Sequence, residues 1–217
     1  MKSGKKEKSK SPSNKNLTKA LIIGGISFLM ISLFIFTLIF FPVVKEEIRY
    51  RTVINMTSGE VQGPQEIVPV DTDFGIVIPK IGANAKVVEN VDPHNSREYQ
   101  VKLTEGIAHA KGSPLPGEFG NTFLFAHSSD NFYNANRYNA VFYLLNKMEK
   151  SDKFFLIKDN VRYEYEVEEK SIVEAEQVEY MDSDLKTQKA TLMTCWPPGT
   201  TIKRLVVVGN LVKEVSL

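Results

Sequence analysis

The one cysteine of this 217-residue chain, Cys195, ends an apolar run that starts at Ala190 and has the composition of a strand. An arginine, Arg204, follows nine residues later, and a histidine, His127, ends an earlier apolar run that starts at Asn121. A thiolate can attack a carbonyl carbon, an imidazole can carry the protons, and a guanidinium can stabilise the oxyanion. These three residue types are therefore candidates for a nucleophilic acyl-transfer site.

Each candidate also has a purely structural interpretation. A free cysteine is often a small buried apolar side chain, and most arginines are solvated. His109 also lies in a plausible strand, so the pattern alone does not separate it from His127. The third histidine, His94, lies in Asp-Pro-His-Asn, which is typical of an exposed turn. An exported protein that keeps an unpaired thiol is open to oxidation, which favours a chemical use for it.

The net charge of +1 conceals two oppositely charged parts of the chain. Residues 1–19 carry seven lysines and one acid, whereas residues 45–217 carry 20 basic and 25 acidic residues. Between them, residues 20–44 contain no charge and are rich in Ile, Leu and Phe. A helix of that length would measure about 37 Å, enough to cross a hydrocarbon core of about 30 Å. We therefore expect a transmembrane helix over residues 20–44.

The charge pattern also predicts the orientation of the chain. Lysines before the span place the N-terminus in the cytoplasm and the acidic part outside. A cleaved signal peptide has a shorter apolar region followed by a small-residue cleavage site, which is missing here. We expect a basic cytoplasmic tail (1–19), a signal anchor in the cell membrane (20–44), an extracytoplasmic linker (45–73) and a catalytic domain (74–217). The acidic domain lacks the basic face that nucleic-acid binding requires.

From residue 74 onward, the pattern is that of short strands separated by turn residues. We expect strands within 75–79, 85–89, 121–127, 153–158, 162–168, 190–195 and 205–212. Helical spacing of apolar residues is found at 138–148, and a short helix is expected within 95–103. Seven or eight strands with one or two helices in about 145 residues favour a mainly β fold, a closed or nearly closed barrel.

Several motifs resemble those of one enzyme family. Thr-Leu-Met-Thr-Cys (191–195) with Arg204 resembles the nucleophile motif of the sortases, and Ile-Pro-Lys-Ile-Gly (78–82) resembles their opening strand. Four further segments resemble the central block that leads to the family's histidine: 106–109, 114–118, 120–122 and 126–127. The resemblance covers Ile76 to Val212. Sortases are membrane-anchored cysteine transpeptidases with an eight-stranded β-barrel, and this fold is therefore expected here.

The resemblance implies a role for each candidate residue. Cys195 would be the nucleophile, His127 the catalytic histidine and Arg204 the essential arginine, whereas His109 would have a structural or loop-packing role. Such an enzyme cleaves a C-terminal sorting signal of exported proteins through a thioacyl intermediate. It then transfers the acyl group to an amine of a cell-wall peptide or a pilin lysine. No cofactor and no required metal are expected, because the acidic residues between Val173 and Lys189 show no ligand spacing.

Two residues beside the cysteine are candidates for substrate binding, Thr194 and Trp196. In an alternating strand, Thr194 points away from Cys195, which favours a packing or backbone-positioning role over catalysis. Trp196, followed by two prolines, could form a stiff exposed turn or one wall of the substrate groove. We favour the wall, because this residue directly follows the nucleophile.

Two other classes of protein stay open at this point. An L,D-transpeptidase is also a cell-wall cysteine acyl-transferase, but its Ser-x-Gly-Cys setting does not match Met193 to Trp196. A non-enzymatic, membrane-tethered β-domain would use Cys195 as a core residue. Within the sortase resemblance, Ala126 replaces a glycine found in many relatives. The acidic segment before Lys189 leaves the subclass and the preferred signal undetermined.

Overall fold

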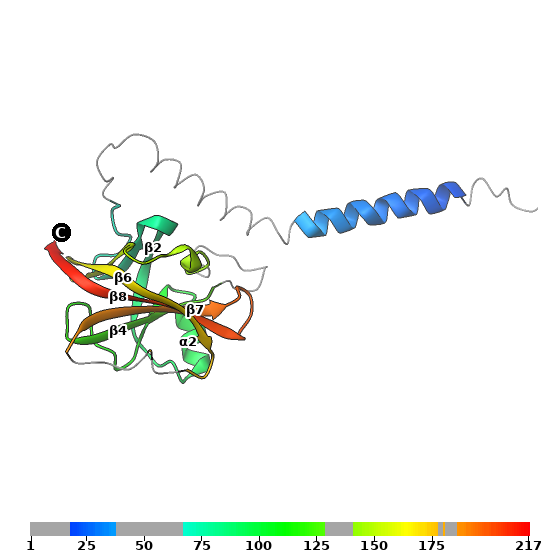
Figure 1. The fold of residues 1–217 in the computed structure, drawn as a ribbon. Coiled ribbons are helices and arrows are strands. Elements are labelled where there is room, and N and C mark those ends of the chain that lie inside the picture. The colour runs from blue at the N-terminus through cyan, green and yellow to red at the C-terminus, as the bar shows by residue number, and fades with distance from the viewer. Residues whose placement is uncertain (1–17, 38–66, 129–140, 178–179, 181–185) are drawn as a thin grey trace, which may run out of the picture. The chain divides into compact units, whose positions relative to one another are not determined.

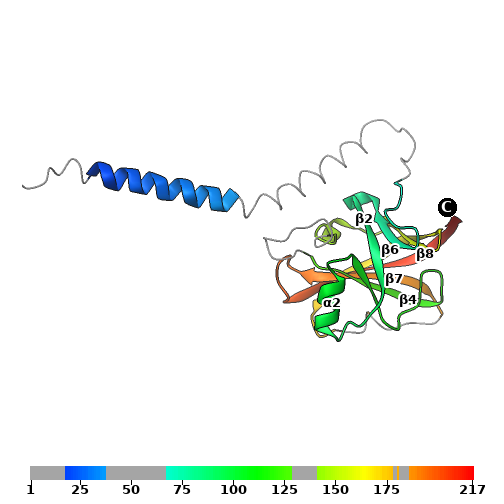
Figure 2. The same ribbon diagram turned by 180° about the vertical axis from the view of Figure 1, so that it is seen from behind.

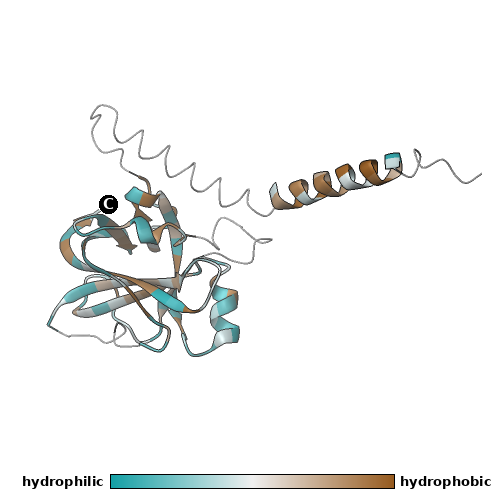
Figure 3. Cartoon of the chain, turned by 45° about the vertical axis from the view of Figure 1, so that its right-hand side comes forward, coloured by the Kyte–Doolittle hydropathy of each residue, from teal (hydrophilic) through white to brown (hydrophobic). Residues whose placement is uncertain are grey.

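The structure is a computed structural model that describes residues 18–37, 67–128, 141–177, 180 and 186–217. The chain divides into two units, Met1–Val43 and Val44–Leu217, each described here by itself. In the first unit, Thr18–Thr37 form a helix of 20 residues, which is mostly apolar on the side seen in Figure 3 and long and apolar enough to cross a membrane. At 1.5 Å per residue it is about 30 Å long, the thickness of a hydrocarbon core. The predicted apolar helix is confirmed over residues 20–37, whereas residues 1–17 and 38–44 lie outside the described parts.

The second unit is a closed β-barrel (Figures 1 and 2). Its eight described strands are β1 (Phe74–Ile78), β2 (Ala83–Val91), β3 (Ile107–Ala110), β4 (Gly120–Phe125), β5 (Lys153–Lys158), β6 (Val161–Glu174), β7 (Gln188–Trp196) and β8 (Lys203–Ser216). Three short helices accompany them: η1 (Pro79–Ile81), α2 (Ser96–Lys102) and η2 (Leu145–Lys147). Around the barrel the strands follow the order β1-β2-β3-β4-β7-β8-β6-β5. The predicted mainly β, eight-stranded barrel is confirmed.

Strands distant in the sequence become neighbours on one side of the barrel. β4 pairs in parallel with β7, and β7 pairs antiparallel with β8, which in turn pairs with β6. A parallel pair cannot be joined by a hairpin, so the chain runs through β5 and β6 between β4 and β7. This arrangement brings the C-terminal ends of β4 and β7 to the N-terminal end of β8.

The β8 strand is covered on both of its faces over its first half. Leu205 and Val207 belong to the barrel core, whereas Val206 and Val208 belong to a second, smaller cluster on the outer face. Successive residues of a strand point to opposite faces, so a continuous apolar run needs a cover on each side. The strand predicted within 205–212 is therefore present as β8, and it is covered on both faces over residues 205–208.

The two helix predictions had different outcomes. The predicted helix at 95–103 is confirmed as α2, and its N-terminus is capped by Asn95, whose side-chain oxygen accepts a hydrogen bond from the Glu98 amide. The α-helix predicted from the spacing at 138–148 is wrong, because residues 141–148 form turns and the 3₁₀ helix η2. Phe142, Leu145 and Met148 are fully buried at intervals of three residues, which is the period of a 3₁₀ helix. Residues 138–140 lie outside the described parts.

The last residues of the predicted linker are fastened to the barrel. The Asn84 side chain accepts a hydrogen bond from the Val70 amide (2.9 Å) and donates one to the Val68 carbonyl (2.8 Å). Asp71 accepts from the Phe74 amide, and a Cβ on Gly75 would lie 2.3 Å from the Asp71 carbonyl oxygen. Glycine is therefore required where this segment enters β1. Residues 45–66 of the predicted linker lie outside the described parts.

Candidate active site

The strand register places Cys195 and Arg204 directly opposite each other. Cys195 of β7 pairs with Arg204 of β8 in the antiparallel ladder. Residues directly opposite in such a ladder point to the same face, with Cβ atoms about 4.5–5.5 Å apart. Cys195 is a free, half-buried cysteine and belongs to neither hydrophobic cluster. Its sulfur and the arginine side chain therefore start from one side of the barrel wall.

His127 follows β4 and reaches the same place from the other side of β7. The β4–β7 register pairs Phe125 with Met193, and the Ala126 amide donates to the Met193 carbonyl at 3.2 Å. His127 lies two residues beyond the last pair of this ladder, and Cys195 lies two residues beyond Met193, so both residues follow the same end of the β4–β7 pair. Cys195 and Arg204 are thus opposite each other where β7 ends and β8 begins, and His127 follows the end of the neighbouring strand β4.

Arg204 is braced by the connection between β7 and β8. Its Nη1 donates to the carbonyls of Thr201 and Lys203, both at 3.0 Å. A guanidinium carries five N–H groups in a planar fork, and the other three are on Nη2 and Nε. The neighbouring Lys203 has a different environment, because its ammonium pairs with Glu174 of β6 at 2.8 Å. The local geometry thus orients the guanidinium of Arg204 through its backbone contacts.

Thr194 joins the two strands that carry Cys195 and His127. Its hydroxyl donates to the Ala126 carbonyl at 2.8 Å, so a bond connects the residue before the cysteine to the residue before the histidine. Thr194 pairs with Leu205, which lies in the barrel core, and only 2% of Thr194 is exposed. This environment fits a backbone-positioning role and offers almost no surface for direct contact with a substrate.

Trp196 lies on the opposite face of β7 from Cys195, because the two are consecutive in a strand. It is half-buried and packs against the barrel core. A pocket of about 330 Å³ lies beside it, lined by Asn146, Lys170, Ser171, Ile172, Trp196 and Leu205. Trp196 thus forms part of a wall, and a pocket adjoins the residue that follows the cysteine.

An outer apolar surface on the same side as Cys195 was not predicted from the sequence. Val173, Val206 and Val208 form the small cluster noted above, and Met193 and Tyr180 pack against it. Met193 is two residues from Cys195, and Val206 is two residues from Arg204, so these side chains share one face of the sheet. The continuous apolar run of β8 was the signal for such a surface, but it does not show which residues cover it.

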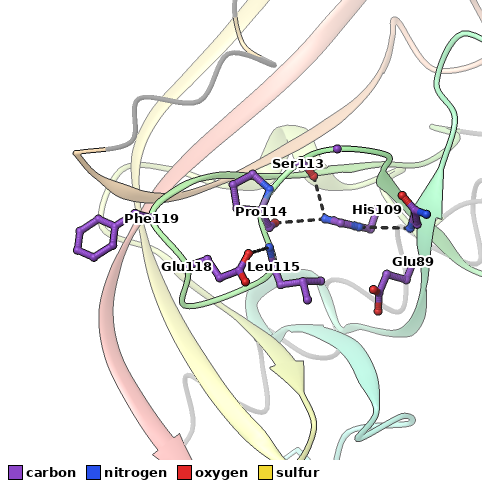
Figure 4. Close-up of a pocket in the computed structure, with 9 residues that line it drawn as sticks. Glu89, His109, Ser113, Pro114, Leu115, Glu118 and Phe119 are labelled. Carbon is purple, nitrogen blue, oxygen red and sulfur yellow. Dashed lines mark hydrogen bonds between the residues drawn. The ribbon is translucent and has the colours of Figure 1, made fainter.

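The remaining buried histidine, His109, lies in a separate cleft of about 700 Å³ (Figure 4). His109 of β3 is opposite Leu124 of β4, which is opposite Leu192 of β7. β3 and β7 are two strand spacings apart, and Cys195 lies three residues beyond Leu192 along β7. The backbone of His109 is therefore about 14 Å from that of Cys195. His109 and its cleft are therefore separate from Cys195. His94 is exposed, in a turn, as expected.

Ser113 and His109 have the contact distance of a serine–histidine dyad, 2.8 Å from Oγ to Nε2, but the wrong proton arrangement. The Asn90 amide can only donate, so Nδ1 of His109 accepts and the proton of the neutral ring is on Nε2. The Ser113 hydroxyl donates to the Ala110 carbonyl, which leaves its oxygen to accept from Nε2. A general base would need an unprotonated Nε2. This pair is therefore structural.

Burial also keeps His109 neutral. Only 3% of the residue is exposed, and burial lowers the pKa of its imidazole below the usual value, partly offset by the Pro114 carbonyl near Nε2 and by nearby acids. The loop-packing role expected for this histidine fits these contacts, because its two ring nitrogens connect β2 to the loop after β3.

Among the described residues, no group of three or more His, Cys, Asp or Glu side chains could hold a metal ion. Of the acids between Val173 and Lys189, Glu179, Asp182 and Asp184 lie outside the described parts. The absence of a required metal therefore stays a prediction.

A closed eight-stranded barrel with a cysteine, a histidine and an arginine at neighbouring strand ends defines a recognisable class of protein. Residues 76–212 match the family model of the sortase domain. The chain belongs to the sortase family.

Curated relatives and a solved structure agree with this assignment. The chain is 27% identical to sortase D of Bacillus subtilis over 138 residues, which are 62% of this chain and 61% of that protein. It is 28% identical to sortase A of Listeria monocytogenes over 143 residues, 65% of this chain and 57% of that protein. The chain thus spans about three fifths of these relatives. The crystal structure of Listeria monocytogenes sortase A superposes with a TM-score of 0.55 at 27% identity, covering 68% of this chain and 92% of that one. The relatives belong to more than one subclass, and the subclass of this chain is unresolved.

Proposed function

We propose that this protein is a cysteine transpeptidase. It cleaves a C-terminal sorting signal of exported proteins and transfers the new carboxyl end to an amine. The observation that supports this function is the pairing of Cys195 with Arg204, with His127 following the end of the neighbouring strand β4. Membership of the sortase family supports the same reaction class.

In the first half of the reaction, the thiolate of Cys195 attacks the carbonyl carbon of the scissile amide. The carbon–sulfur bond forms as the tetrahedral intermediate develops its oxyanion, which the guanidinium of Arg204 stabilises. The carbon–nitrogen bond then breaks. The imidazolium of His127 gives its proton to the departing amine, and a thioacyl enzyme remains.

In the second half, an amine acceptor replaces the departed peptide. Neutral His127 takes a proton from the amine as its nitrogen attacks the thioester carbon, and the carbon–sulfur bond breaks to restore the thiolate. The product is a new amide. Water in place of the amine yields the free acid, so exclusion of water from the site decides between transfer and hydrolysis.

Two regions adjacent to Cys195 suit the two parts of a peptide. The acyl side of the sorting signal lies at Met193, which is half-buried on the same face of β7 as the sulfur. The leaving group, and after it the acceptor, passes around the end of β7 to the pocket at Trp196, which lies on the opposite face of the strand from Cys195. The acceptor is an amine of a cell-wall peptide or a pilin lysine.

The N-terminal helix anchors the enzyme in the cell membrane. In this proposal residues 1–19 are a basic cytoplasmic tail, residues 20–44 cross the membrane, residues 45–73 form an extracytoplasmic linker, and residues 74–217 are the catalytic domain. The apolar helix Thr18–Thr37 and the lysine-rich residues before it support this topology.

The test uses full-length protein in detergent micelles and a randomised library of quenched fluorescent peptides. We expect the wild type to cleave a subset of the library and to form a thioacyl adduct visible by intact mass spectrometry. Cys195→Ala should abolish both while its thermal melt stays nearly unchanged. Thr104→Ala, which removes an exposed hydroxyl bonded to the Val101 carbonyl, is the control and should cleave normally. Cleavage by Cys195→Ala would exclude Cys195 as the nucleophile. A thiol that iodoacetamide does not label, together with no cleavage, would favour a non-enzymatic domain.

A further inference from the structure

Residues 197–200 form a tight turn at the start of the connection between β7 and β8. The Thr200 amide donates to the Pro197 carbonyl at 3.0 Å, and Gly199 has a φ of 80°. A type II turn favours proline at its second position and needs a left-handed residue at its third, a conformation that glycine adopts without strain. The sequence Pro-Pro-Gly-Thr meets both conditions and fixes the course of the chain directly after β7, the strand that carries Cys195.

The side chain of Thr200 adds a second bond across this turn. Its hydroxyl donates to the Pro197 carbonyl at 2.8 Å, so one carbonyl accepts from both the amide and the hydroxyl of Thr200. The next two residues, Thr201 and Ile202, are exposed. Burial therefore does not hold this segment in place, and its course depends on the hydrogen bonds of the turn.

The segment that follows the turn is the one that binds Arg204. Nη1 of Arg204 donates to the carbonyls of Thr201 and Lys203, both at 3.0 Å. Lys203 belongs to β8, whereas Thr201 lies outside the strand and directly follows the turn. Two carbonyl partners on one nitrogen fix the plane of the guanidinium, and with it the directions in which Nη2 and Nε donate. These directions therefore depend on where the turn places the Thr201 carbonyl.

We propose that Thr200 is a positioning residue for the transpeptidation. Its hydroxyl holds the turn, the turn places the Thr201 carbonyl, and that carbonyl aims the guanidinium of Arg204 at the oxyanion. The part that concerns the oxyanion rests on the proposed function, whereas the series of bonds from Thr200 to Arg204 does not. A free arginine side chain samples many rotamers, so holding it in one geometry before the reaction lowers the barrier.

The variants separate the hydroxyl from the rest of the side chain. Thr200→Val keeps the branched shape and removes the hydroxyl, and Thr200→Ser keeps the hydroxyl as the rescue variant. Thr104→Val is the matched control, because Thr104 also donates its amide and its hydroxyl to one carbonyl three residues earlier, that of Val101, at 3.1 and 2.7 Å. Thr104 follows α2, which contacts β2 and β3.

Arginine modification tests the bonds from Thr200 to Arg204 without any substrate. Full-length protein in micelles is treated with phenylglyoxal, and peptide mass spectrometry follows the rate at Arg204 relative to that at exposed Arg97. Loss of one hydrogen bond from the turn should raise this relative rate about fivefold in Thr200→Val, with Thr200→Ser and Thr104→Val within about twofold of the wild type. An unchanged rate at Arg204 in Thr200→Val overturns the proposal. If that variant does not fold, Gly199→Ala replaces it, since a Cβ at a φ of 80° strains the turn.

Steady-state kinetics with the library peptide that the wild type cleaves fastest tests the consequence for catalysis. The oxyanion forms in the transition state and is absent from the bound substrate, so Thr200→Val should lower kcat about fivefold with KM within about twofold. Thr200→Ser and Thr104→Val should have nearly wild-type kinetics. A raised KM with an unchanged kcat would mean that Thr200 contacts the substrate, and it overturns the positioning role.

A double-mutant cycle shows whether the effect passes through Arg204. Lysine has no planar fork to aim, so in the Arg204→Lys background Thr200→Val should change kcat by less than about twofold. A loss of about fivefold in both backgrounds would be additive, and it overturns a role through Arg204. If the wild type cleaves no peptide, the proposed function fails, while the modification rates still decide whether Thr200 positions the guanidinium.

Discussion

Replacing Thr194 with valine tests whether one buried hydroxyl aligns the two strands of the active site. Valine has nearly the shape of threonine, but it removes the donor that the Ala126 carbonyl accepts at 2.8 Å. Because Thr194 is buried, an unsatisfied carbonyl there costs about 1–3 kcal/mol of the free energy of unfolding. For a domain of this size, the melting temperature should fall by about 2–12 °C.

The effect on activity should exceed the effect on folding. Thr194 and Ala126 directly precede Cys195 and His127, so losing their bond lets the two strand ends shift against each other. A misplacement of about 1 Å can reduce the rate about 100-fold, and we expect kcat/KM for the library peptide to fall by about 10- to 100-fold. Thr194→Ser keeps the hydroxyl and should keep most of the activity.

The control is a buried threonine with a different partner. Thr122 of β4 is also buried and its side chain is hydrogen-bonded to Tyr165, away from the strand ends. Thr122→Val should show a comparable loss of melting temperature with kcat/KM nearly unchanged. Equal kcat/KM in Thr194→Val and the wild type would refute the reasoning. If kcat/KM falls equally in Thr122→Val and Thr194→Val, the loss of activity is due to reduced stability alone.

Three further predictions concern other parts of the domain. Arg204→Lys keeps the charge but loses the planar fork, so kcat/KM for the library peptide should fall about 100-fold; wild-type kinetics would remove Arg204 from the site. Burial lowers the pKa of His109, so the unfolded chain binds more protons than the folded one below about pH 6.5. The contribution of His109 to the free energy of unfolding is therefore complete above that pH and is lost as the pH falls. The free energy of unfolding, measured in urea, should differ less between pH 7.5 and pH 5.5 in His109→Gln than in the wild type. An equal difference would assign the loss to other groups. Trp196→Ala should raise KM for an amine acceptor about tenfold and increase the share of hydrolysis, because it removes one wall of the pocket at β7; an unchanged ratio of transfer to hydrolysis would place the acceptor elsewhere.

The incorrect helix prediction at 138–148 shows what a local sequence pattern cannot determine. Apolar residues recur there at a spacing compatible with an α-helix, but Phe142, Leu145 and Met148 follow a period of three and form turns and η2. The two periods differ by too little to be separated over two turns. For the strands, alternation and β-branched composition were sufficient, and every predicted strand has a counterpart in the barrel.

The sequence by itself determined the apolar N-terminal helix, the β-rich domain and, through its motifs, the family and the three candidate residues. Only the tertiary structure distinguished His127 from His109 on physical grounds. Hydrogen bonds of Ala126, the residue before His127, join it to Met193 and Thr194 just before Cys195, whereas both ring nitrogens of buried His109 are occupied by a loop network. It alone revealed the bond from Thr194 to Ala126 and the contact of Asn121 with Tyr180, which join residues 68 and 59 positions apart. Residue patterns report on neighbours within a few positions, whereas these contacts depend on which distant strands pair when the barrel closes.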